Sequence, residues 1–351
     1  MSETSECGCV QESLLVGIGN PLLDISANVD EQLLQKYELK PDDAIMAEEK
    51  HMPLYREMID KYKAEFIAGG SVQNSLRVSQ WILKTPKVCT YFGCVGDDDY
   101  AKILKERAIA EGVNVQYQVT RAAPTGTCAV LVTGTHRSLC ANLAAAQLFT
   151  PDHLAGEESR RCIQAAKFFY VSGFFVAVSP PSIMQLAAHA HAHGHTFLMN
   201  LSAPFVSQFY KEPLEQILPY VDVLLGNEME AEAFAKAFGI DEPNLEAVAA
   251  RMAAMPKLNA RRERVVIITQ GCEPVILAQG ARVQLVPVAR LARDQIVDTN
   301  GAGDAFAGGC LAQLVLGKPY ATAVRCGVHA ATRVIQHSGC TFTGDCDFAD
   351  S

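Results

Sequence analysis

The string Asp298-Thr299-Asn300-Gly301-Ala302-Gly303-Asp304-Ala305-Phe306 joins a glycine-rich turn to an apolar helical segment. Gly301 and Gly303 carry no Cβ, so the backbone there can approach a ligand closely and direct several N–H groups at one point. The N-terminus of the following helix adds a positive partial charge. The string therefore predicts an anion hole, with the Asp304 carboxylate beside it in the first helical turn.

A carboxylate next to a hole for developing phosphate charge suits the transfer of a phosphoryl group to a hydroxyl, with Asp304 as general base. The structural alternative is an ordinary glycine turn in which Asp304 only begins a helix, and a short Gly-x-Gly pattern fits both. The full string is more specific than that pattern. No GxxxxGK[ST] occurs, which excludes a P-loop kinase, and Gly17-Ile18-Gly19 lacks the third glycine of a dinucleotide fingerprint.

Upstream of this string, short apolar runs alternate with longer amphipathic segments, which is typical of an α/β fold with a mainly parallel sheet covered by helices. The expected strands are 14–18, 88–95, 168–171, 196–200, 221–225 and 265–269. The expected helices are 72–83, 100–111, 182–193, 228–238 and 245–255, followed in the tail by 304–316 and 320–335. We expect a layered sandwich.

Two segments, 22–68 and 115–141, interrupt the alternation, and the second alternates Thr127, Ala129, Leu131 and Thr133. Both are expected to pair as antiparallel strands outside the main sheet and to form a small discontinuous lid. We assign residues 1–20, 70–120 and 142–351 to a large body and residues 21–69 and 121–141 to the lid. Helix-like stretches in 33–58 would cover one face of the lid sheet, which favours a monomer.

Composition excludes several classes of protein. The 351 residues hold 30 Lys and Arg against 39 Asp and Glu, a net charge of −9 that disfavours a nucleic-acid or anionic-membrane partner. No apolar run approaches the roughly 18 residues of a membrane helix, and residues 1–13 lack the basic start and apolar stretch of a signal peptide. The 12 Cys lie mostly in apolar segments, where free Cys acts as a small hydrophobe. We expect a soluble protein of the reducing cytoplasm, with nuclear presence left open.

Five further strings accompany the glycine-rich one: GNPLLDI at 19–25, GGSVQN at 69–74, RSLCANLAA at 137–145, NLSAPF at 200–205 and GNEMEA at 226–231. Together they resemble the ribokinase-like family of carbohydrate and nucleoside kinases, in particular its adenosine-specific branch. They occur in the family's order, and the resemblance covers nearly the whole chain, from residue 19 to residue 343. It implies a ribokinase-like three-layer α/β/α sandwich with a small β-lid, and ATP- and Mg²⁺-dependent phosphorylation of the 5′-hydroxyl of adenosine.

The sequence around Asp24 indicates a ligand site even without the resemblance. A strand that ends in Gly19 delivers Asn20 and, after the turn at Pro21, Asp24 to the carboxyl edge of the sheet, where ligands of α/β proteins bind. One carboxylate can accept hydrogen bonds from both hydroxyls of a vicinal diol. The resemblance assigns Asp24 to the 2′- and 3′-hydroxyls of ribose, and the structural alternative is a carboxylate that caps a turn.

The resemblance implies three groups of site residues. The catalytic group comprises Asp304, the anion-hole residues Gly301, Ala302 and Gly303, and Arg137, whose guanidinium would move over the transferring phosphate as the lid closes. The nucleoside group comprises Asn20, Leu22, Asp24, Gly69, Gly70, Ser71, Asn74, Leu139, Ala141, Phe175, Phe205 and Asn300. For ATP it implies Asn227, Thr269, Gly271, His329 and Ala330, with Glu230 holding Mg²⁺ through water.

Some of these residues have purely structural alternatives. Asn227 and Glu230 also fit an N-cap with a carboxylate in the first helical turn. Without the resemblance, Arg137 would be interpreted as an exposed surface charge. A metal site is disfavoured in the row His189, His191, His193 and His195, because no Cys or carboxylate accompanies it.

Two other functions stay open. A sugar kinase of the same fold, such as a ribokinase or fructokinase, would need a small polar pocket. A nucleoside-binding protein without activity would have no use for a base, so the intact Asp304 argues against it. The tail string TGDC at 343–346 stands where the family has a proline-containing tail.

Overall fold

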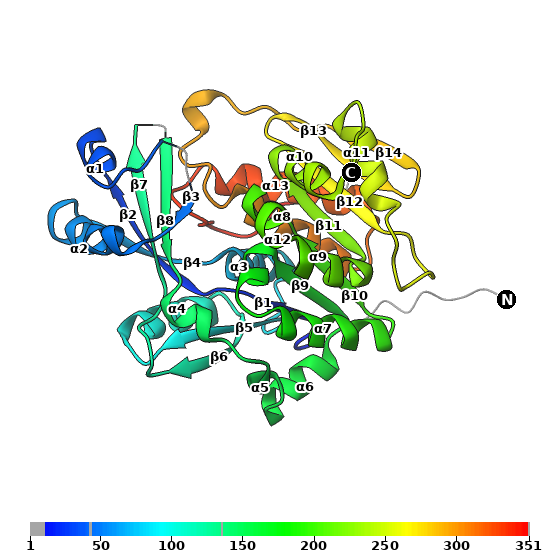
Figure 1. Cartoon of the computed structure of the whole chain (residues 1–351), viewed down its shortest axis with the longest axis horizontal. Coiled ribbons are helices and arrows are strands. Elements are labelled where there is room, and N and C mark those ends of the chain that lie inside the picture. Colours follow the sequence, from blue (N-terminus) through cyan, green and yellow to red (C-terminus); the bar gives the residue numbers. More distant parts are fainter. Residues whose placement is uncertain (1–10, 42–43, 135, 350–351) are drawn as a thin grey trace.

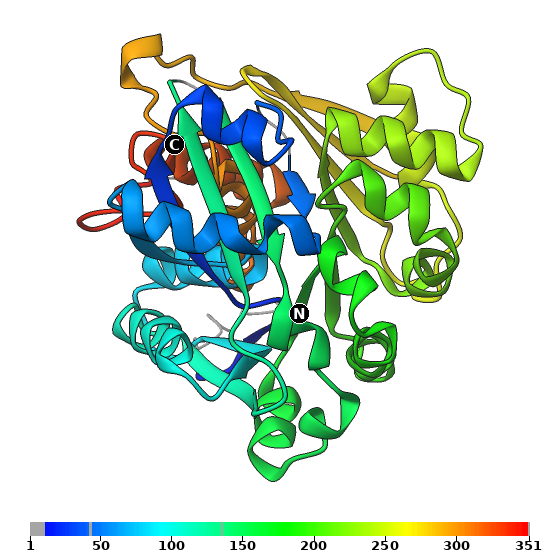
Figure 2. The same ribbon diagram turned by 60° about the vertical axis from the view of Figure 1, so that its left-hand side comes forward.

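The computed structural model describes residues 11–41, 44–134 and 136–349 (Figures 1 and 2), so most of the N-terminal stretch tested for a signal peptide lies outside it. A nine-stranded sheet has the order β14-β13-β12-β11-β10-β9-β1-β5-β6. The strands are β1 (Leu15–Ile18), β5 (Cys89–Gly96), β6 (Asn114–Thr120), β9 (Phe168–Ser172), β10 (Thr196–Asn200), β11 (Val223–Asn227), β12 (Val265–Gln270), β13 (Glu273–Gln279) and β14 (Arg282–Val286). The pairs from β6 to β12 are parallel, and β13 and β14 add an antiparallel edge.

The inner strands are buried on both faces. In β10, Phe197 and Met199 pack into one hydrophobic core and Leu198 into the other, and in β1 Val16 and Leu15 divide in the same way. Side chains alternate across a strand, so helices on both faces bury every position. This is why the strands read as unbroken apolar runs in the sequence.

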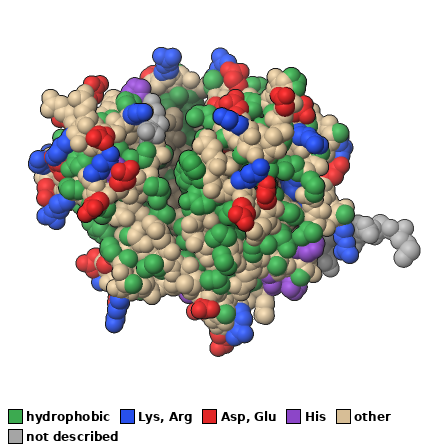
Figure 3. Space-filling view, in the orientation of Figure 1, with side chains coloured by type: hydrophobic (Ala, Val, Ile, Leu, Met, Phe, Trp, Pro, Cys, Tyr) green, Lys and Arg blue, Asp and Glu red, His purple; other side chains and the backbone are tan. Residues whose placement is uncertain are grey.

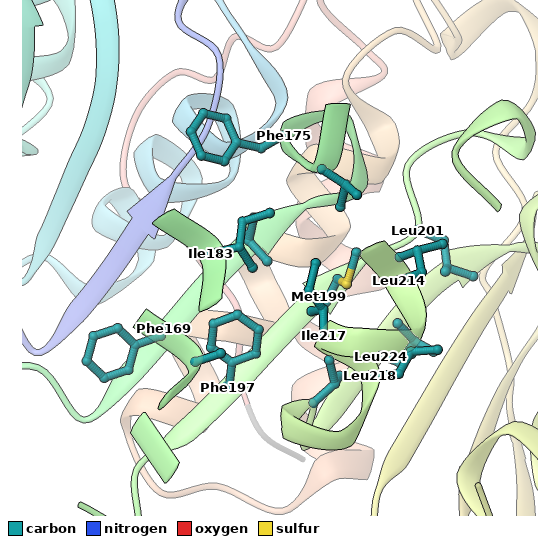
Figure 4. Close-up of a cluster of buried hydrophobic side chains, with 14 of the residues drawn as sticks. Phe169, Phe175, Ile183, Phe197, Met199, Leu201, Leu214, Ile217, Leu218 and Leu224 are labelled. Carbon is teal, nitrogen blue, oxygen red and sulfur yellow. The ribbon is translucent and has the colours of Figure 1, made fainter. Parts of the chain in front are cut away.

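Helices cover the two faces of the main sheet. The first core, part of which Figure 4 shows around Phe169 and Ile183, lies under α5 (Pro151–Leu154), α6 (Glu157–Ala165), α7 (Pro180–Ala192), α9 (Lys211–Ile217), α10 (Glu228–Phe238) and α11 (Leu245–Ala253). The second core lies under α3 (Ser71–Leu83), α12 (Ala302–Val315) and α13 (Tyr320–Val334), to which α4 (Asp99–Ala110) adds Ala108. The predicted three-layer sandwich is confirmed.

A second, five-stranded sheet stands beside the first (left in Figure 1) in the order β3-β8-β7-β2-β4. Its strands are β2 (Leu22–Asn28), β3 (Ala44–Met46), β4 (Glu65–Gly69), β7 (Thr127–Thr133) and β8 (His136–Asn142). Two helices, α1 (Glu31–Lys36) and α2 (Met52–Lys61), bury one face of this small sheet through Ile25, Leu131 and Cys140. The opposite face, which carries Asp24 and Arg137, is left for the main body.

Two expectations about the interrupting segments are wrong. Residues 114–120 form β6, which is a parallel edge strand of the main sheet, since period-two alternation cannot tell a half-buried edge strand from a strand of a separate sheet. The small sheet is also mixed rather than antiparallel, because β2 pairs with β7 and β3 with β8 in parallel.

Several elements were not expected: the hairpin β13–β14, the short helix α8 (Pro204–Phe209), and the helices α5, α6 and α9. Within the described ranges, no helix combines the length and the apolar composition that a crossing of the bilayer requires.

Candidate functional site

A cavity of about 330 Å³ opens at the carboxyl ends of β10, β11 and β12, where the space-filling view is hollowed between the two sheets (Figure 3). The N-terminus of α12 points into it. Its walls are formed by Ser71, Phe174, Asn200, Ser202, Leu225, Gly226, Asn227, Glu228, Glu230, Thr269, Gly271, Thr299, Ala302, Gly303, Asp304 and Phe306. This is the edge at which open α/β sheets bind ligands.

The two glycines at the start of α12 have different surroundings. Gly301 is the N-cap and has a φ of +78°, and a Cβ there would lie 2.8 Å from the Cβ of Cys340. A Cβ at Gly303 would meet no atom within 4 Å, because this residue faces the open cavity. Gly301 is thus required by the turn, whereas Gly303 leaves room for a ligand.

Backbone donors at the helix start form the expected anion hole with one change. The N–H of Ala302 donates to the carbonyl of Thr299 at 3.2 Å, so Ala302 does not offer its amide to a ligand, contrary to the prediction. Within the described part of the chain, the N–H groups of Gly303 and Asp304 donate to no acceptor. These two amides, at the positive end of α12, are the donors available to an anion.

Asp304 is held by two side chains of α3. Its Oδ1 accepts from Ser71 Oγ at 2.7 Å and its Oδ2 accepts from Asn74 Nδ2 at 3.0 Å. Burial raises the pKa of Asp304 to about 6, although both hydrogen bonds favour the carboxylate. Asp304 is therefore an oriented carboxylate whose pKa suits a general base near neutral pH.

Asp24 lies on β2 against the end of β4. A Cβ at Gly69 would fall 2.3 Å from Asp24 Oδ1, so only glycine leaves space for this carboxylate. Burial and then the nearby Asp304 raise the pKa of Asp24 to about 8, against the lowering effect of Arg77. No donor in the described segments contacts the carboxylate, so it is available to a ligand.

Asn20 precedes Asp24 by four residues, and Gly70 follows the Gly69 that Asp24 contacts. The Oδ1 atom of Asn20 is buried and has no hydrogen-bond partner among the described residues. Gly70 has a φ of +93° and approaches the Asn20 carbonyl so closely that a Cβ would lie 2.3 Å from its oxygen. An unpaired buried acceptor costs free energy unless a ligand or water supplies the missing donor.

Asn227 and Glu230 form a capping box at the start of α10. Asn227 Oδ1 accepts from the N–H of Glu230 at 2.8 Å, and Glu230 Oε2 accepts from the N–H of Asn227 at 3.1 Å. The structural alternative for this pair is therefore realised. Both residues also line the cavity, and burial raises the pKa of Glu230 to about 7.

Arg137 reaches from β8 to the glycine-rich turn. Its Nε lies 2.6 Å from Asp298 Oδ1 and its side chain is 12% exposed, which rules out a simple surface charge. Asp298 also accepts from the N–H groups of Asn300 at 2.8 Å and Gly339 at 2.7 Å. Leu139 follows Arg137 by two positions and shares its face of the strand, as Ala141 does, opposite the Cys140 that packs under the helices.

Three expected ligand contacts do not fit the structure. Phe175 is fully buried and packs edge-on against Phe149, and its neighbour Phe174 lines the cavity instead, at 6.0 Å between ring centroids from Phe205. Ala330 is buried in the core beside α3, and His329 contacts Asp347 at 3.0 Å outside the cavity wall. Thr269 and Gly271, which were expected to bind ATP together with His329 and Ala330, do line the cavity.

Several wall residues were missed. Asn200 is the last residue of β10 and Ser202 follows it, Gly226 lies near the end of β11, and Thr299 and Phe306 flank the anion hole. The rule that ligands meet the carboxyl ends of parallel strands would have found the first three once the strands were known. No local pattern distinguishes Phe174 from Phe175, since both lie in one apolar run.

Comparisons with known proteins agree with this geometry. Residues 32–345 match the model of the pfkB family carbohydrate kinases. The chain belongs to this family. The fold and the kinase family predicted from the motifs are thereby confirmed.

The members of the pfkB family that are similar to this chain include adenosine kinases. The chain is 47% identical to adenosine kinase 1 of Arabidopsis thaliana over 337 residues, which are 96% of this chain and 98% of that one. It is 44% identical to adenosine kinase of Schizophyllum commune, over 93% and 95% of the two chains. The structure of Anopheles gambiae adenosine kinase with P1,P4-di(adenosine-5) tetraphosphate superposes with a TM-score of 0.93 at 59% identity, covering 96% and 100%. That of Schistosoma mansoni adenosine kinase with 2-fluoroadenosine gives 0.91 at 36% identity, covering 95% and 98%.

Proposed function

We propose that this pfkB-family protein is an adenosine kinase, which transfers the γ-phosphoryl group of ATP to the 5′-hydroxyl of adenosine. The new bond joins the 5′-oxygen to the γ-phosphorus, the bond from that phosphorus to the bridging oxygen breaks, and AMP and ADP result. The observation that carries the proposal is the Asp304 carboxylate, fixed by Ser71 and Asn74 beside the free amides of Gly303 and Asp304.

In this proposal Asp304 accepts the proton of the 5′-hydroxyl as the oxygen attacks. The two free amides and the helix N-terminus stabilise the negative charge that develops on the transferring group. Arg137 lies on the facing strand and is directed at the same turn through Asp298, so its guanidinium is close to that charge. The chemistry thus depends mainly on positioning and electrostatics, as is usual for phosphoryl transfer.

Nucleoside recognition is proposed for the group around Asp24. The carboxylate would accept hydrogen bonds from the ribose 2′- and 3′-hydroxyls, and the unpaired Oδ1 of Asn20 would gain a donor. Gly69 and Gly70 make room for Asp24 and for the Asn20 carbonyl beside the proposed sugar site, while Leu22, Leu139, Ala141, Phe174 and Phe205 supply an apolar wall to the base.

The residues of the site fit a magnesium ion that is held mainly by phosphates and water. Within the described residues no group of three His, Cys, Asp or Glu is arranged to hold a metal, so a cage made of protein ligands is absent. Asn227 and Glu230 carry oxygen atoms that can act as ligands at the cavity wall, and they suit a cation held mainly by phosphates and water. Bound there, Mg²⁺ would supply charge neutralisation to the ATP phosphates.

The small sheet is proposed to act as a lid, with boundaries at 21–69 and 121–141. Helices α1 and α2 already cover its outer face, which leaves no open sheet face for a second subunit and supports a monomer. A reducing cytoplasmic location is supported by the ten cysteines in the described ranges, none of which is in a disulfide.

Turnover of a panel of nucleosides and sugars with ATP and Mg²⁺ tests this function. We expect AMP from adenosine and no product from ribose or fructose. Phosphorylation of a free sugar in preference to adenosine would establish the sugar kinase alternative. Tight adenosine binding by calorimetry without any ADP formation would establish a binding protein.

A further inference from the structure

We propose that Arg77, a buried side chain outside the cavity, is a positioning residue that orients the Asn74 carboxamide and thereby sets the pH range over which Asp304 works. The inference rests on the proposed role of Asp304 as general base.

The guanidinium of Arg77 is fully buried and fixed from several sides. Nη1 donates to Asn74 Oδ1 and to the carbonyl of Ala68, both at 3.1 Å, and the fork of Nε and Nη2 binds the Glu111 carboxylate. The ring of Phe342 lies under it at 5.8 Å. Four of its five N–H groups donate to protein acceptors and the side chain is fully buried, so Arg77 acts through a neighbour rather than on a ligand.

Asn74 is the link between Arg77 and Asp304. Its Oδ1 accepts from Arg77 and its Nδ2 donates to Asp304 Oδ2 at 3.0 Å. A guanidinium only donates hydrogen bonds. If the Asn74 carboxamide flipped, its NH₂ group would face an N–H donor of Arg77, and its oxygen would face an acceptor oxygen of the Asp304 carboxylate. Arg77 therefore keeps the donating end of Asn74 on Asp304, which favours the ionised form of that carboxylate.

Without Arg77 the balance would change. The Asn74 carboxamide would be free to flip, and its Oδ1 would then accept a hydrogen bond from protonated Asp304. Four titratable groups on other elements interact electrostatically with Asp304: Asp24 on β2, Glu230 on α10, Tyr170 on β9 and Cys340 after α13. Asp24 and Glu230 become negative on ionisation in the working pH range, so they also favour the protonated form, whereas burial raises the pKa of Tyr170 and of Cys340 so far that both stay neutral.

The pH profile of kcat with saturating adenosine and Mg-ATP tests this role. We expect Arg77→Met to move the acid limb up by about one pH unit, so that kcat falls about fivefold at pH 6 and by less than about twofold at pH 8.5. Arg77→Lys keeps a charged side chain that only donates, and we expect it to hold the limb within about 0.3 units of the parent.

Arg264 provides a matched control. It is also fully buried, and among the described residues its guanidinium donates only to main-chain carbonyls, those of Leu218, Val221, Met252, Met255 and Pro256. We expect Arg264→Met to lower the melting temperature without moving the acid limb. A limb that moves as far in Arg264→Met as in Arg77→Met would reduce Arg77 to a structural residue.

Arg77→Gln is a second loss variant in case Arg77→Met does not fold, because glutamine can still bind Glu111 but carries no charge and also accepts. An acid limb unchanged in whichever of the two folds overturns the inference. Asp304→Asn separates this failure from that of the proposed function. If Asp304→Asn retains normal turnover, the base itself is wrong, whereas lost turnover with an unmoved limb in the Arg77 variants overturns only the role of Arg77.

Discussion

At the scale of single residues, Asp304 gives the most direct test of the chemistry. Asp304→Asn preserves the shape of the side chain but removes its capacity to accept a proton. We expect turnover to fall by about 10² or more while adenosine affinity changes only a few-fold. Steady-state kinetics and calorimetry measure the two quantities, and near-normal turnover would leave Asp304 as a helix-start carboxylate.

The pH dependence of adenosine binding tests Asp24. The pKa of its carboxyl is raised to about 8 in the free protein, so most of it is neutral at pH 7. If ribose binds the carboxylate, affinity rises with pH between 6.5 and 8.5 and levels off above that. Titration calorimetry should show this rise in the parent and a weaker, pH-independent affinity in Asp24→Asn, and equal profiles would exclude Asp24 from the site.

The same carboxyl also affects stability, with the opposite sign. The pKa of Asp24 is about 8 in the folded state against an ordinary value of 3.8, so the folded state holds the proton more tightly and stability falls as pH rises from about 4 to about 8. Asp24→Asn removes this loss. We expect its ligand-free melting temperature at pH 8 to exceed that of the parent by at least about 2 °C, or about 1 kcal/mol.

The site residues that the sequence predicted correctly are those that belong to a local motif. Asp304, Gly303 and Ser71 lie at the cavity because the glycine turn and the helix N-terminus are local features. Phe175 was one position off, since which of two adjacent aromatic residues faces a cavity depends on the turn of Gly173–Ala177 after β9. His329 failed for a similar reason, as its surroundings depend on where the chain goes after α13.

At the scale of elements, the turn before α12 contains two glycines that we expect to respond differently to alanine. Gly301→Ala places a Cβ at positive φ and against Cys340, so we expect a loss of about 1–2 kcal/mol of stability. Gly303→Ala fills only open space and should leave the melting temperature unchanged or slightly higher. Its methyl group nevertheless lies where the phosphoryl group is proposed to bind.

Thermal melts and kcat of the two variants measure this difference. We expect Gly303→Ala to lose turnover in a fully stable protein and Gly301→Ala to lose stability first. Normal turnover in Gly303→Ala would mean that the amides of this helix do not contact the transferred group.

Most of the buried strands and long helices were predicted, and the two edge strands were not. Strands such as β10 and helices such as α10 matched the sequence pattern because both faces, or one full stripe, are apolar. The edge strands β6 and β14 have mixed patterns, with most side chains of β14 exposed, whereas the missed strand β13 buries the short apolar run Val275, Ile276, Leu277 and Ala278. Their positions follow from pairing with the rest of the sheet, which no short window of sequence contains.

At the scale of the whole molecule, closure of the small sheet over the cavity is the main expected motion. Adenosine alone should protect the backbone amides of β2, β4, β7 and β8 from hydrogen exchange, because the sheet closes on the bound nucleoside. Amides of β10 and β11 provide the internal reference. Unchanged exchange in all four strands at saturating adenosine would show a rigid or wrongly assigned lid.

Arg137→Ala completes this test, since the side chain joins the small sheet to the turn of Asp298. We expect it to reduce turnover more than adenosine affinity. A larger effect on affinity would make Arg137 a binding contact rather than part of the closing movement.

The pairing of β2 with β7 also constrains how the protein is made. Leu23 pairs with Thr127, and α3, β5, α4 and β6 all lie between them in the chain. During synthesis, β2 leaves the ribosome long before its partner and can pair early only with β4, so its other edge stays open until much of the body has emerged. The nascent chain thus carries an unpaired strand edge beside apolar Ile25 and Ala27, which is the feature that chaperones protect from aggregation.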